Sequence, residues 1–387
     1  MTVFVLHEIG KALSLAFAMF WQVLWPLAIG FLLSAIVEAL VSKQMIARLL
    51  GRDRPREVAI ATLLGAASSS CSYAAVALAR TLFRKGATLG NAIIFEFAST
   101  NLVFELGLVL LILLGWQFLS AELLGGLVMI VGLAIVLKLT LSRRLVSAAH
   151  EHAERGLLGR MEGHAAMDMS VTDGPFLQRA FSGPALTSIA HYFFMSIYSL
   201  WTDLVLGFLI AGALGSWVSD SVWSSLFLQG HGLLSEVWGA LIGPLVAVVS
   251  FVCSVGNVPL AAVLWRGGIS FGGVIAFIFA DLIILPILNI YRKYYGRRVA
   301  VHLFVVSYLT MAVAGLVVGL LFNASGLTPS NRHVTVFDTS VSWNYDTYLN
   351  IAVLLGSAAL LVRFLRTGGI EMLRMMGMPK QAHATQR

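Results

Sequence analysis

The chain has 387 residues, of which 58% are hydrophobic and 12% are charged, and its formal net charge is +7. A water-soluble domain carries about 25% charged residues, so this composition excludes an ordinary soluble protein. The positive charge does not indicate binding to nucleic acid, because the Lys and Arg residues lie in short segments between apolar runs, where they orient a protein in the bilayer.

Apolar segments follow one another along the whole chain. Each is about as long as the ~20 residues that a helix needs to cross the hydrocarbon core. The runs are continuous, whereas a transmembrane β-barrel shows alternating strands. We therefore predict an all-α polytopic membrane protein whose partner is the lipid bilayer. The apolar runs lie near residues 12–42, 58–83, 87–116, 118–142, 186–216, 237–265, 269–291, 299–323 and 347–364.

Four regions are expected from the alternation of apolar and polar segments. They are a first transmembrane repeat (1–142), a cytoplasmic linker (143–183), a second transmembrane repeat (184–323), and an extra helix with a basic tail (324–387). The linker contains several histidines and acidic residues. Their spacing matches no closed metal site, so a solvated linker is the favoured interpretation and a metal sensor the alternative.

The two transmembrane regions are copies of each other. When the chain is aligned with itself so that Cys71 falls on Cys253, no gap is needed, and 13 of the 28 positions from Cys71 to Ala98 are identical. We call this match the repeat alignment. Cys71 and Cys253 are the two cysteines of the chain, and each is followed by a serine. Each copy interrupts an apolar run with small and polar residues, which predicts a broken helix.

The basic residues distinguish two topologies. If both repeat cores cross the membrane, nine spans result, with 14 of the 26 Lys and Arg residues on the cytoplasmic side and 12 outside. If each core is a re-entrant hairpin, about seven helices cross, and 23 basic residues lie inside against three outside. The positive-inside rule favours the second arrangement, in which the two repeats are inverted. Inverted repeats with broken helices are typical of secondary transporters.

Several motifs resemble one bacterial family. They are the two Cys-Ser cores, the run Phe95-Glu96-Phe97-Ala98-Ser99-Thr100-Asn101-Leu102, and the run from Val252 to Ala262, which contains Cys-Ser-x-Gly-Asn-x-Pro-Leu. The chain is similar over roughly 15–320 to the predicted-permease family that includes the organoarsenical-efflux permeases. The resemblance implies an inner-membrane transporter of a bacterium. The chain departs from the Cys-Ser-Cys form of some members, because Ser69 stands in place of another thiol.

The two cysteines are the first candidates for a substrate site. Each is expected to precede a half-helix, whose dipole favours the thiolate form. A pair of thiolates suits a soft ligand such as trivalent arsenic or a thiophilic metal ion. The alternative is that Cys71 and Cys253 are small residues that permit close helix packing.

Polar residues at the breaks extend this candidate site. Their hydroxyl and amide groups would contact the substrate, or would satisfy the ends of the half-helices. The substrate-binding candidates besides the cysteines are Ser70, Ser72, Asn101, Ser254 and Asn257.

Four acidic residues lie within apolar spans, where an ionisable group is costly and is by default a functional hypothesis. These coupling candidates are Glu96, Glu105, Asp203 and Asp281. Proton-coupled transport needs such a group to gain and lose a proton. The alternative is that they form buried pairs with Arg80, Arg84 or His191.

Three classes of function remain open at this point. A secondary transporter, exporting a soft thiophilic solute, is the leading interpretation, and an uncoupled channel or a permease for an unrelated small solute is the alternative. An embedded enzyme is disfavoured, because the chain has neither a Cys-x-x-Cys pair nor a phosphate-binding Gly-Lys-Ser/Thr motif. We expect no cofactor. The oligomeric state stays open, a homo-oligomer included.

Overall fold

The computed structural model describes residues 2–40, 48–69, 72–153, 169–171, 178–179, 181–217, 225–228, 230–250, 254–332, 343 and 345–377. In these parts of the chain, every regular element is a helix. The expected all-α class is therefore confirmed. A helix satisfies its backbone hydrogen bonds internally, which suits a chain that is apolar nearly throughout.

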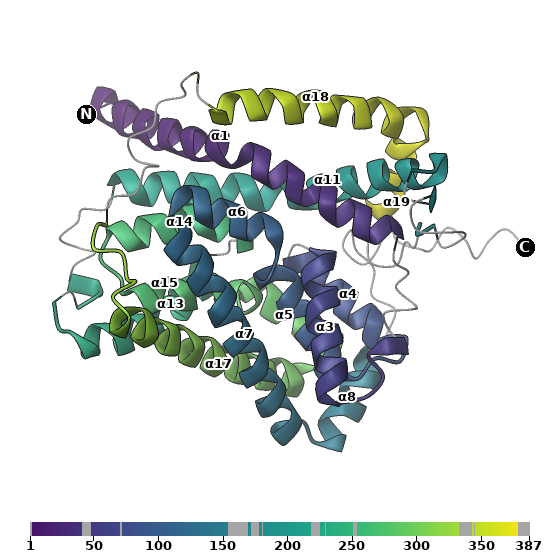
Figure 1. Cartoon of the computed structure of the whole chain (residues 1–387), viewed down its shortest axis with the longest axis horizontal. Helices are drawn as coiled ribbons and strands as arrows, with labels where there is room; N and C mark the ends of the chain where they lie inside the picture. The colour runs from purple at the N-terminus through teal and green to yellow at the C-terminus, as the bar shows by residue number, and fades with distance from the viewer. Residues whose placement is uncertain are drawn as a thin grey trace, which may run out of the picture.

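The helices of the first half include two pairs that are separated by short breaks (Figure 1). They are α1 (Thr2–Leu40), α3 (Pro55–Ser68), α4 (Ser72–Arg84), α5 (Leu89–Asn101), α6 (Phe104–Leu113), α7 (Trp116–Thr140) and α8 (Arg143–Ala153).

The second half contains eight α-helices and one 3-10 helix among the described residues. Its elements are α11 (Gly183–Trp217), α13 (Leu233–Ser250), α14 (Ser254–Arg266), α15 (Phe271–Phe279), the 3-10 helix η1 (Ala280–Leu282), α16 (Leu285–Tyr295), α17 (Arg297–Ala324), α18 (Tyr345–Arg366) and α19 (Gly369–Gly377).

Four helices of the described part are long and apolar enough to cross a membrane. They are Leu89–Leu113, Trp116–Thr140, Arg297–Ala324 and Thr347–Arg366. A fifth span results if η1 and its flanking helices, bent by 41° at the break, are taken together. The protein is therefore a helical membrane protein, while the number of crossings stays a prediction.

The helix bounds in the two halves correspond under the repeat alignment. Helix α4 begins at Ser72 and α14 at Ser254, and both have 13 residues. Helix α5 begins after the N-cap Thr88, whose hydroxyl accepts the Asn91 N–H at 3.2 Å. Helix α15 begins after the N-cap Ser270, which accepts the Gly273 N–H at 3.1 Å. The same capping chemistry therefore starts both helices.

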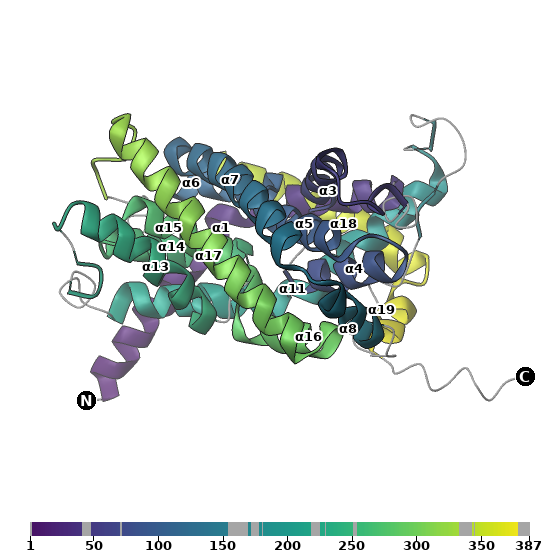
Figure 2. The ribbon, with the colours of Figure 1, turned by 90° about the horizontal axis from the view of Figure 1, so that it is seen from below.

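Three long helices form a layer of their own. Helix α1 packs along α11, and α18 contacts both, on one side of the molecule (Figure 1). The broken helices and α7, α17 and α8 lie on the other side, which Figure 2 shows from below. Helices α14 and α6 connect the layers, since α14 packs on α11 and α6 packs on α1.

Close backbone contacts hold the broken helices in place. A Cβ atom at Gly65 in α3 would lie 2.5 Å from the Phe95 carbonyl oxygen in α5. A Cβ atom at Gly272 in α15 would lie 2.4 Å from the Gly315 carbonyl oxygen in α17. Glycine allows this approach, which is how membrane helices gain van der Waals contact without a hydrophobic driving force.

The start of the predicted linker is a helix that packs against the membrane region. Helix α8 contacts α4 and α16, and the side chains of Ala149 and Ala153 are buried. Arg80 in α4 donates from Nη2 to the Ala153 carbonyl at 2.8 Å, and its guanidinium lies 4.5 Å from the centre of the Tyr294 ring. An arginine thus occupies the C-terminal end of α8, where a cation is favourable.

Candidate functional site

A buried carboxyl group lies where the two halves meet. Asp281 in η1 has no exposed surface. Its Oδ2 atom accepts a hydrogen bond from the hydroxyl of Ser72, the first residue of α4, at 2.7 Å. The break of the second half therefore contacts the beginning of the half-helix in the first half. This contact joins two of the residues that the sequence predicted for different roles.

The end of α5 completes the surroundings of Asp281. Asn101 Nδ2 lies 3.4 Å from Asp281 Oδ1, a long hydrogen bond, and 3.0 Å from the hydroxyl of Thr100. Asn101 and Thr100 are fully buried. We call Ser72, Thr100, Asn101 and Asp281 the break cluster. It contains polar groups from three helix ends, because each broken helix exposes backbone and side-chain groups that need partners.

A second carboxyl group lies next to the break cluster. Glu96 in α5 is fully buried, and its Oε1 atom accepts a hydrogen bond from the hydroxyl of Tyr291 in α16. Glu96 belongs to the same helix as Asn101, whose amide group contacts Asp281. Two carboxyl groups in one buried region are costly when both are charged.

Glu105 occupies a separate place, between α1 and the end of α3. One of its carboxylate oxygens accepts a hydrogen bond from the hydroxyl of Ser69. Ser69 has a positive φ of 37° and caps α3. A Cβ atom at Gly30 in α1 would lie 2.1 Å from the Glu105 Cβ atom, so glycine is needed for α1 to pass over this group. The hydroxyl of Ser69 thus has a carboxylate partner.

Several buried polar atoms near the breaks lack a partner among the described residues. Asn257 in α14 is fully buried, and neither atom of its amide group makes a hydrogen bond there. The same holds for Asn101 Oδ1, Glu96 Oε2 and Glu105 Oε2. A buried polar group without a partner costs about 1–3 kcal/mol, so these atoms suit a ligand that supplies donors and acceptors.

The alternative for the acidic residues was a buried ion pair. In the described part of the chain, Glu96, Glu105 and Asp281 make no salt bridge with a Lys, Arg or His side chain. His191 contacts the hydroxyl of Thr367 at 2.8 Å instead. The carboxyl groups therefore depend on hydroxyl and amide donors, which can hold either the charged or the neutral form.

Several predicted site residues cannot be placed. Ser70, Cys71 and Cys253 lie outside the described residues. Ser254 and Asp203 belong to α14 and α11, but their side chains lie outside the described part. The thiol pair and the Asp203 coupling role stay predictions. The described residues contain no group of three or more His, Cys, Asp or Glu side chains that could hold a metal ion.

Two buried groups were missed by the sequence reasoning. Glu122 in α7 is fully buried, and neither carboxylate oxygen has a hydrogen-bond partner among the described residues. Its signal was present, since it is an acidic residue within an apolar span. Tyr291 had no such signal, because a tyrosine near a basic turn is typical of a membrane interface. Only the fold directs its hydroxyl to Glu96.

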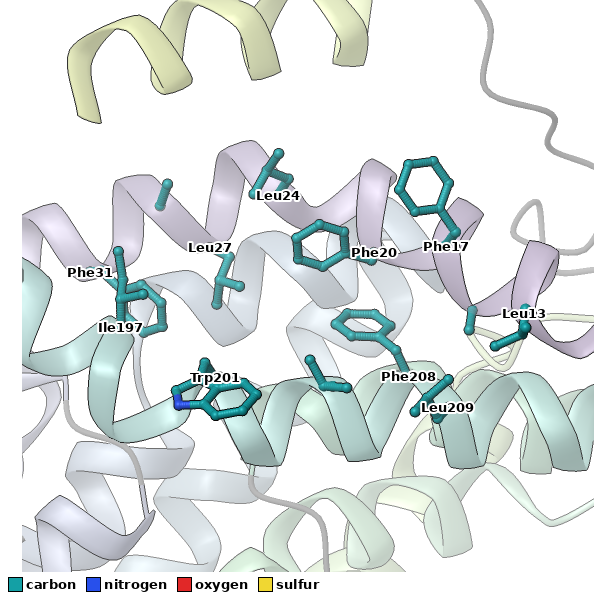
Figure 3. Close-up of a pocket in the computed structure, with 13 residues that line it drawn as sticks. Leu13, Phe17, Phe20, Leu24, Leu27, Phe31, Ile197, Trp201, Phe208 and Leu209 are labelled. Carbon is teal, nitrogen blue, oxygen red and sulfur yellow. The ribbon is translucent and has the colours of Figure 1, made fainter. Parts of the chain in front are cut away.

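An apolar groove of about 450 Å³ lies between α1 and α11 (Figure 3). Phe17, Phe20 and Leu24 line it from α1, and Trp201 and Phe208 line it from α11. The described side chains of its walls are almost entirely hydrocarbon, and these side chains would neither bind an ion nor select a polar solute. The candidate site is therefore the break cluster and not this groove.

Comparison with known proteins identifies the family to which the chain belongs. Residues 8–320 match the family described as predicted permease (ArsP_1). A protein of Mycobacterium tuberculosis that is named as a permease is 59% identical over 338 residues, which cover 87% of this chain and 83% of that protein. The YraQ protein of Escherichia coli is 27% identical over 150 residues, which cover 34% of this chain and 42% of that protein. No solved structure matches the chain. The chain belongs to the predicted permease family.

Proposed function

We propose that this membrane permease moves its solute past the two Cys-Ser breaks, which contain Cys71 and Cys253. We further propose that the movement is coupled to protons at Asp281. The observation that carries the proposal is the position of Asp281. It joins η1 in the second half to Ser72 and Asn101 in the first half. Any solute that opens the breaks must separate these groups, so a change in the protonation of Asp281 changes the energy of opening.

The fold explains why the breaks suit a solute. Irregular backbone is tolerated within a membrane only where it is buried in protein or lines a cavity. The described breaks at 102–103 and 283–284 lie between α5 and α6 and between η1 and α16. Asn101 Oδ1, at the first of these breaks, and the amide group of Asn257, near the start of α14, have no hydrogen-bond partner among the described residues and add hydrogen-bonding capacity. We place the solute between the two repeats, which cross the bacterial inner membrane as inverted copies.

The proposed solute is soft and thiophilic, such as a trivalent organoarsenical or a thiophilic metal ion, and the permease exports it. Cys71 and Cys253 hold equivalent positions in the repeat alignment, and each comes directly before the first residue of a half-helix. Two thiolates bind such a solute together more tightly than either does alone. The hydroxyl and amide groups of the break cluster then contact the rest of the solute.

Proton exchange at the break cluster supplies the driving force. Glu96 and Asp281 each need a proton, a cation or hydrogen bonds to remain buried. Arrival of a proton at Asp281 weakens its acceptance of the Ser72 and Asn101 hydrogen bonds, because a neutral carboxyl group is a poorer acceptor than a carboxylate. The half-helix α4 is then free to move relative to η1.

Transport into proteoliposomes tests the proposal. Purified protein is reconstituted with and without a pH gradient, and uptake of a trivalent organoarsenical is measured for the native chain, Asp281→Asn, and Cys71→Ser with Cys253→Ser. We expect the gradient to stimulate the native protein and not Asp281→Asn. We expect the double cysteine variant to lose most of its transport of the thiophilic solute.

The control is Glu371→Gln, because Glu371 is an exposed acid on α19. Transport that the gradient does not affect in the native protein identifies an uncoupled channel. Uptake of the organoarsenical at the native rate by the double cysteine variant contradicts binding at the two thiols and favours an unrelated small solute. Gradient stimulation that survives in Asp281→Asn contradicts the assignment of coupling to Asp281.

A further inference from the structure

A groove of about 560 Å³ runs between α3 and α7, on a different face from the break cluster. Val58 and Leu63 line one wall, and Leu127, Val131 and Ile135 line the other. The three α7 side chains are between 53% and 56% exposed. Helix α7 is one of the candidate membrane spans, so these side chains face hydrocarbon. The groove is therefore a lipid-facing surface.

The groove is not apolar at both ends. Arg54 and Lys138 line it at one end, together with Asp53. The remaining lining side chains are apolar, apart from the hydroxyl of Thr62. The three charged groups give this end a net charge of +1, which equals in magnitude the single negative charge of a phosphodiester. By the positive-inside rule, this end lies at the cytoplasmic headgroup level.

A more polar pocket of about 320 Å³ adjoins the charged end. It shares Asp53 and Lys138 with the groove and reaches Thr88 and Asn91 at the beginning of α5. Asn91 donates to the carbonyl oxygens of Leu50 and Arg52, but its buried Oδ1 atom has no partner among the described residues. Asp53 accepts the hydroxyl of Thr88. The pocket thus offers acceptors to a group that carries donors.

We propose that this groove binds one membrane phospholipid whose headgroup carries a hydrogen-bond donor. An acyl chain lies along the groove between α3 and α7. The phosphate contacts Arg54 and Lys138, since both cations can reach a phosphate from the headgroup level. The ammonium or hydroxyl group beyond the phosphate enters the polar pocket and donates to Asp53 and to Asn91 Oδ1.

The charges and the free acceptor together define the lipid class. A phosphate alone would be satisfied by any phospholipid. An acceptor pair next to it selects phosphatidylethanolamine or phosphatidylglycerol over phosphatidylcholine, because a trimethylammonium group has no N–H or O–H to donate. Leaving Asn91 Oδ1 buried without a donor costs free energy, which is the source of the discrimination.

Native mass spectrometry of the detergent-purified full chain tests this inference. Phosphatidylethanolamine, phosphatidylglycerol and phosphatidylcholine with identical acyl chains are added in turn, and the lipid-bound fraction is measured. We expect at least one of the first two to bind several-fold more than phosphatidylcholine. Lys138→Ala should weaken binding of all three by about fivefold, which corresponds to the ~1 kcal/mol of a basic residue near an anionic headgroup.

The variants separate the two parts of the site. Val131→Trp fills the groove and should lower binding of all three lipids, while Asp53→Asn removes a carboxylate acceptor and should reduce the preference over phosphatidylcholine. Arg144→Ala is the matched control, because Arg144 is an exposed basic residue that lines neither cavity. Thermal melting identifies variants that fail to fold. If Lys138→Ala is among them, Arg54→Ala is used in its place. Equal binding of the three lipids, or binding that Lys138→Ala and Arg54→Ala leave unchanged, overturns the inference.

Discussion

Ser99 and Asp281 occupy corresponding places in the two halves of the chain, yet their side chains act differently. The Ser99 hydroxyl donates to the Glu96 carbonyl at 2.8 Å, within its own helix. Asp281 accepts hydrogen bonds from Ser72 and Asn101, in the other half. The helices of the two halves thus have corresponding bounds. The residue at this position, serine or aspartate, decides whether its side chain forms a hydrogen bond to the other half.

The acidic residues show the same asymmetry. Glu96 in the first half corresponds to Ile278 in the second, and Asp281 in the second half corresponds to Ser99 in the first. Asp281 of the break cluster therefore comes from one half, and the neighbouring Glu96 comes from the other. Neither acid has an acid at its corresponding position. A functional centre of this kind needs both halves, so neither half alone would contain it.

The largest effect is expected for the side of the membrane from which the last residues of α4 and α14 react with a reagent. Inverted repeats expose corresponding residues on opposite sides of the membrane. Arg84 ends α4 and Arg266 ends α14, and both are exposed. In a background of Cys71→Ser and Cys253→Ser, we expect Arg84→Cys to react with an impermeant thiol reagent only from the cytoplasmic side. Arg266→Cys should react only from outside. Labelling of both cysteines from one side would contradict the inverted arrangement.

A smaller but still large effect on transport is expected when Asp281 is replaced by serine, the residue at the corresponding position, Ser99, of the first half. Asp281→Ser removes the carboxylate acceptor of the buried Ser72 hydroxyl, at about 1–3 kcal/mol, while Asn101 Nδ2 keeps the Thr100 hydroxyl and the Phe97 carbonyl as acceptors. We expect transport in proteoliposomes to fall at least about tenfold, since about 1.4 kcal/mol is a factor of ten. Ser99→Ala, which removes only a bond within one helix, should keep near-native transport. Equal transport by the two variants would show that the difference between these positions has no functional role.

The smallest effect is expected for the two serines that begin the half-helices. Ser72 donates to Asp281, and a typical intramolecular hydrogen bond makes a net contribution of about 0.5–1.5 kcal/mol. We expect Ser72→Ala to shift the pH dependence of transport and to lower its rate several-fold, because Asp281 keeps the Asn101 donor. The matched variant is Ser254→Ala. A pH profile that Ser72→Ala leaves unchanged would show that this hydroxyl does not act through Asp281.

Much of the architecture follows from local sequence. Apolar runs of membrane-spanning length predicted the helices, and the small and polar residues at 68–72 predicted that α3 and α4 would be separate. The repeat alignment predicted corresponding helix starts at Ser72 and Ser254. These features depend on composition and on short-range backbone preferences, which can be read from a single segment.

The contacts of the site depend on tertiary structure. Asp281 was recognised as an acid within an apolar span, but its partner Ser72 is 209 residues away in the chain. Glu96 was recognised in the same way, while the hydroxyl that reaches it belongs to Tyr291, 195 residues away. Which buried group receives which donor is decided by how the broken helices pack against one another. That packing is set by close approaches such as Gly272 on Gly315, which no single segment contains.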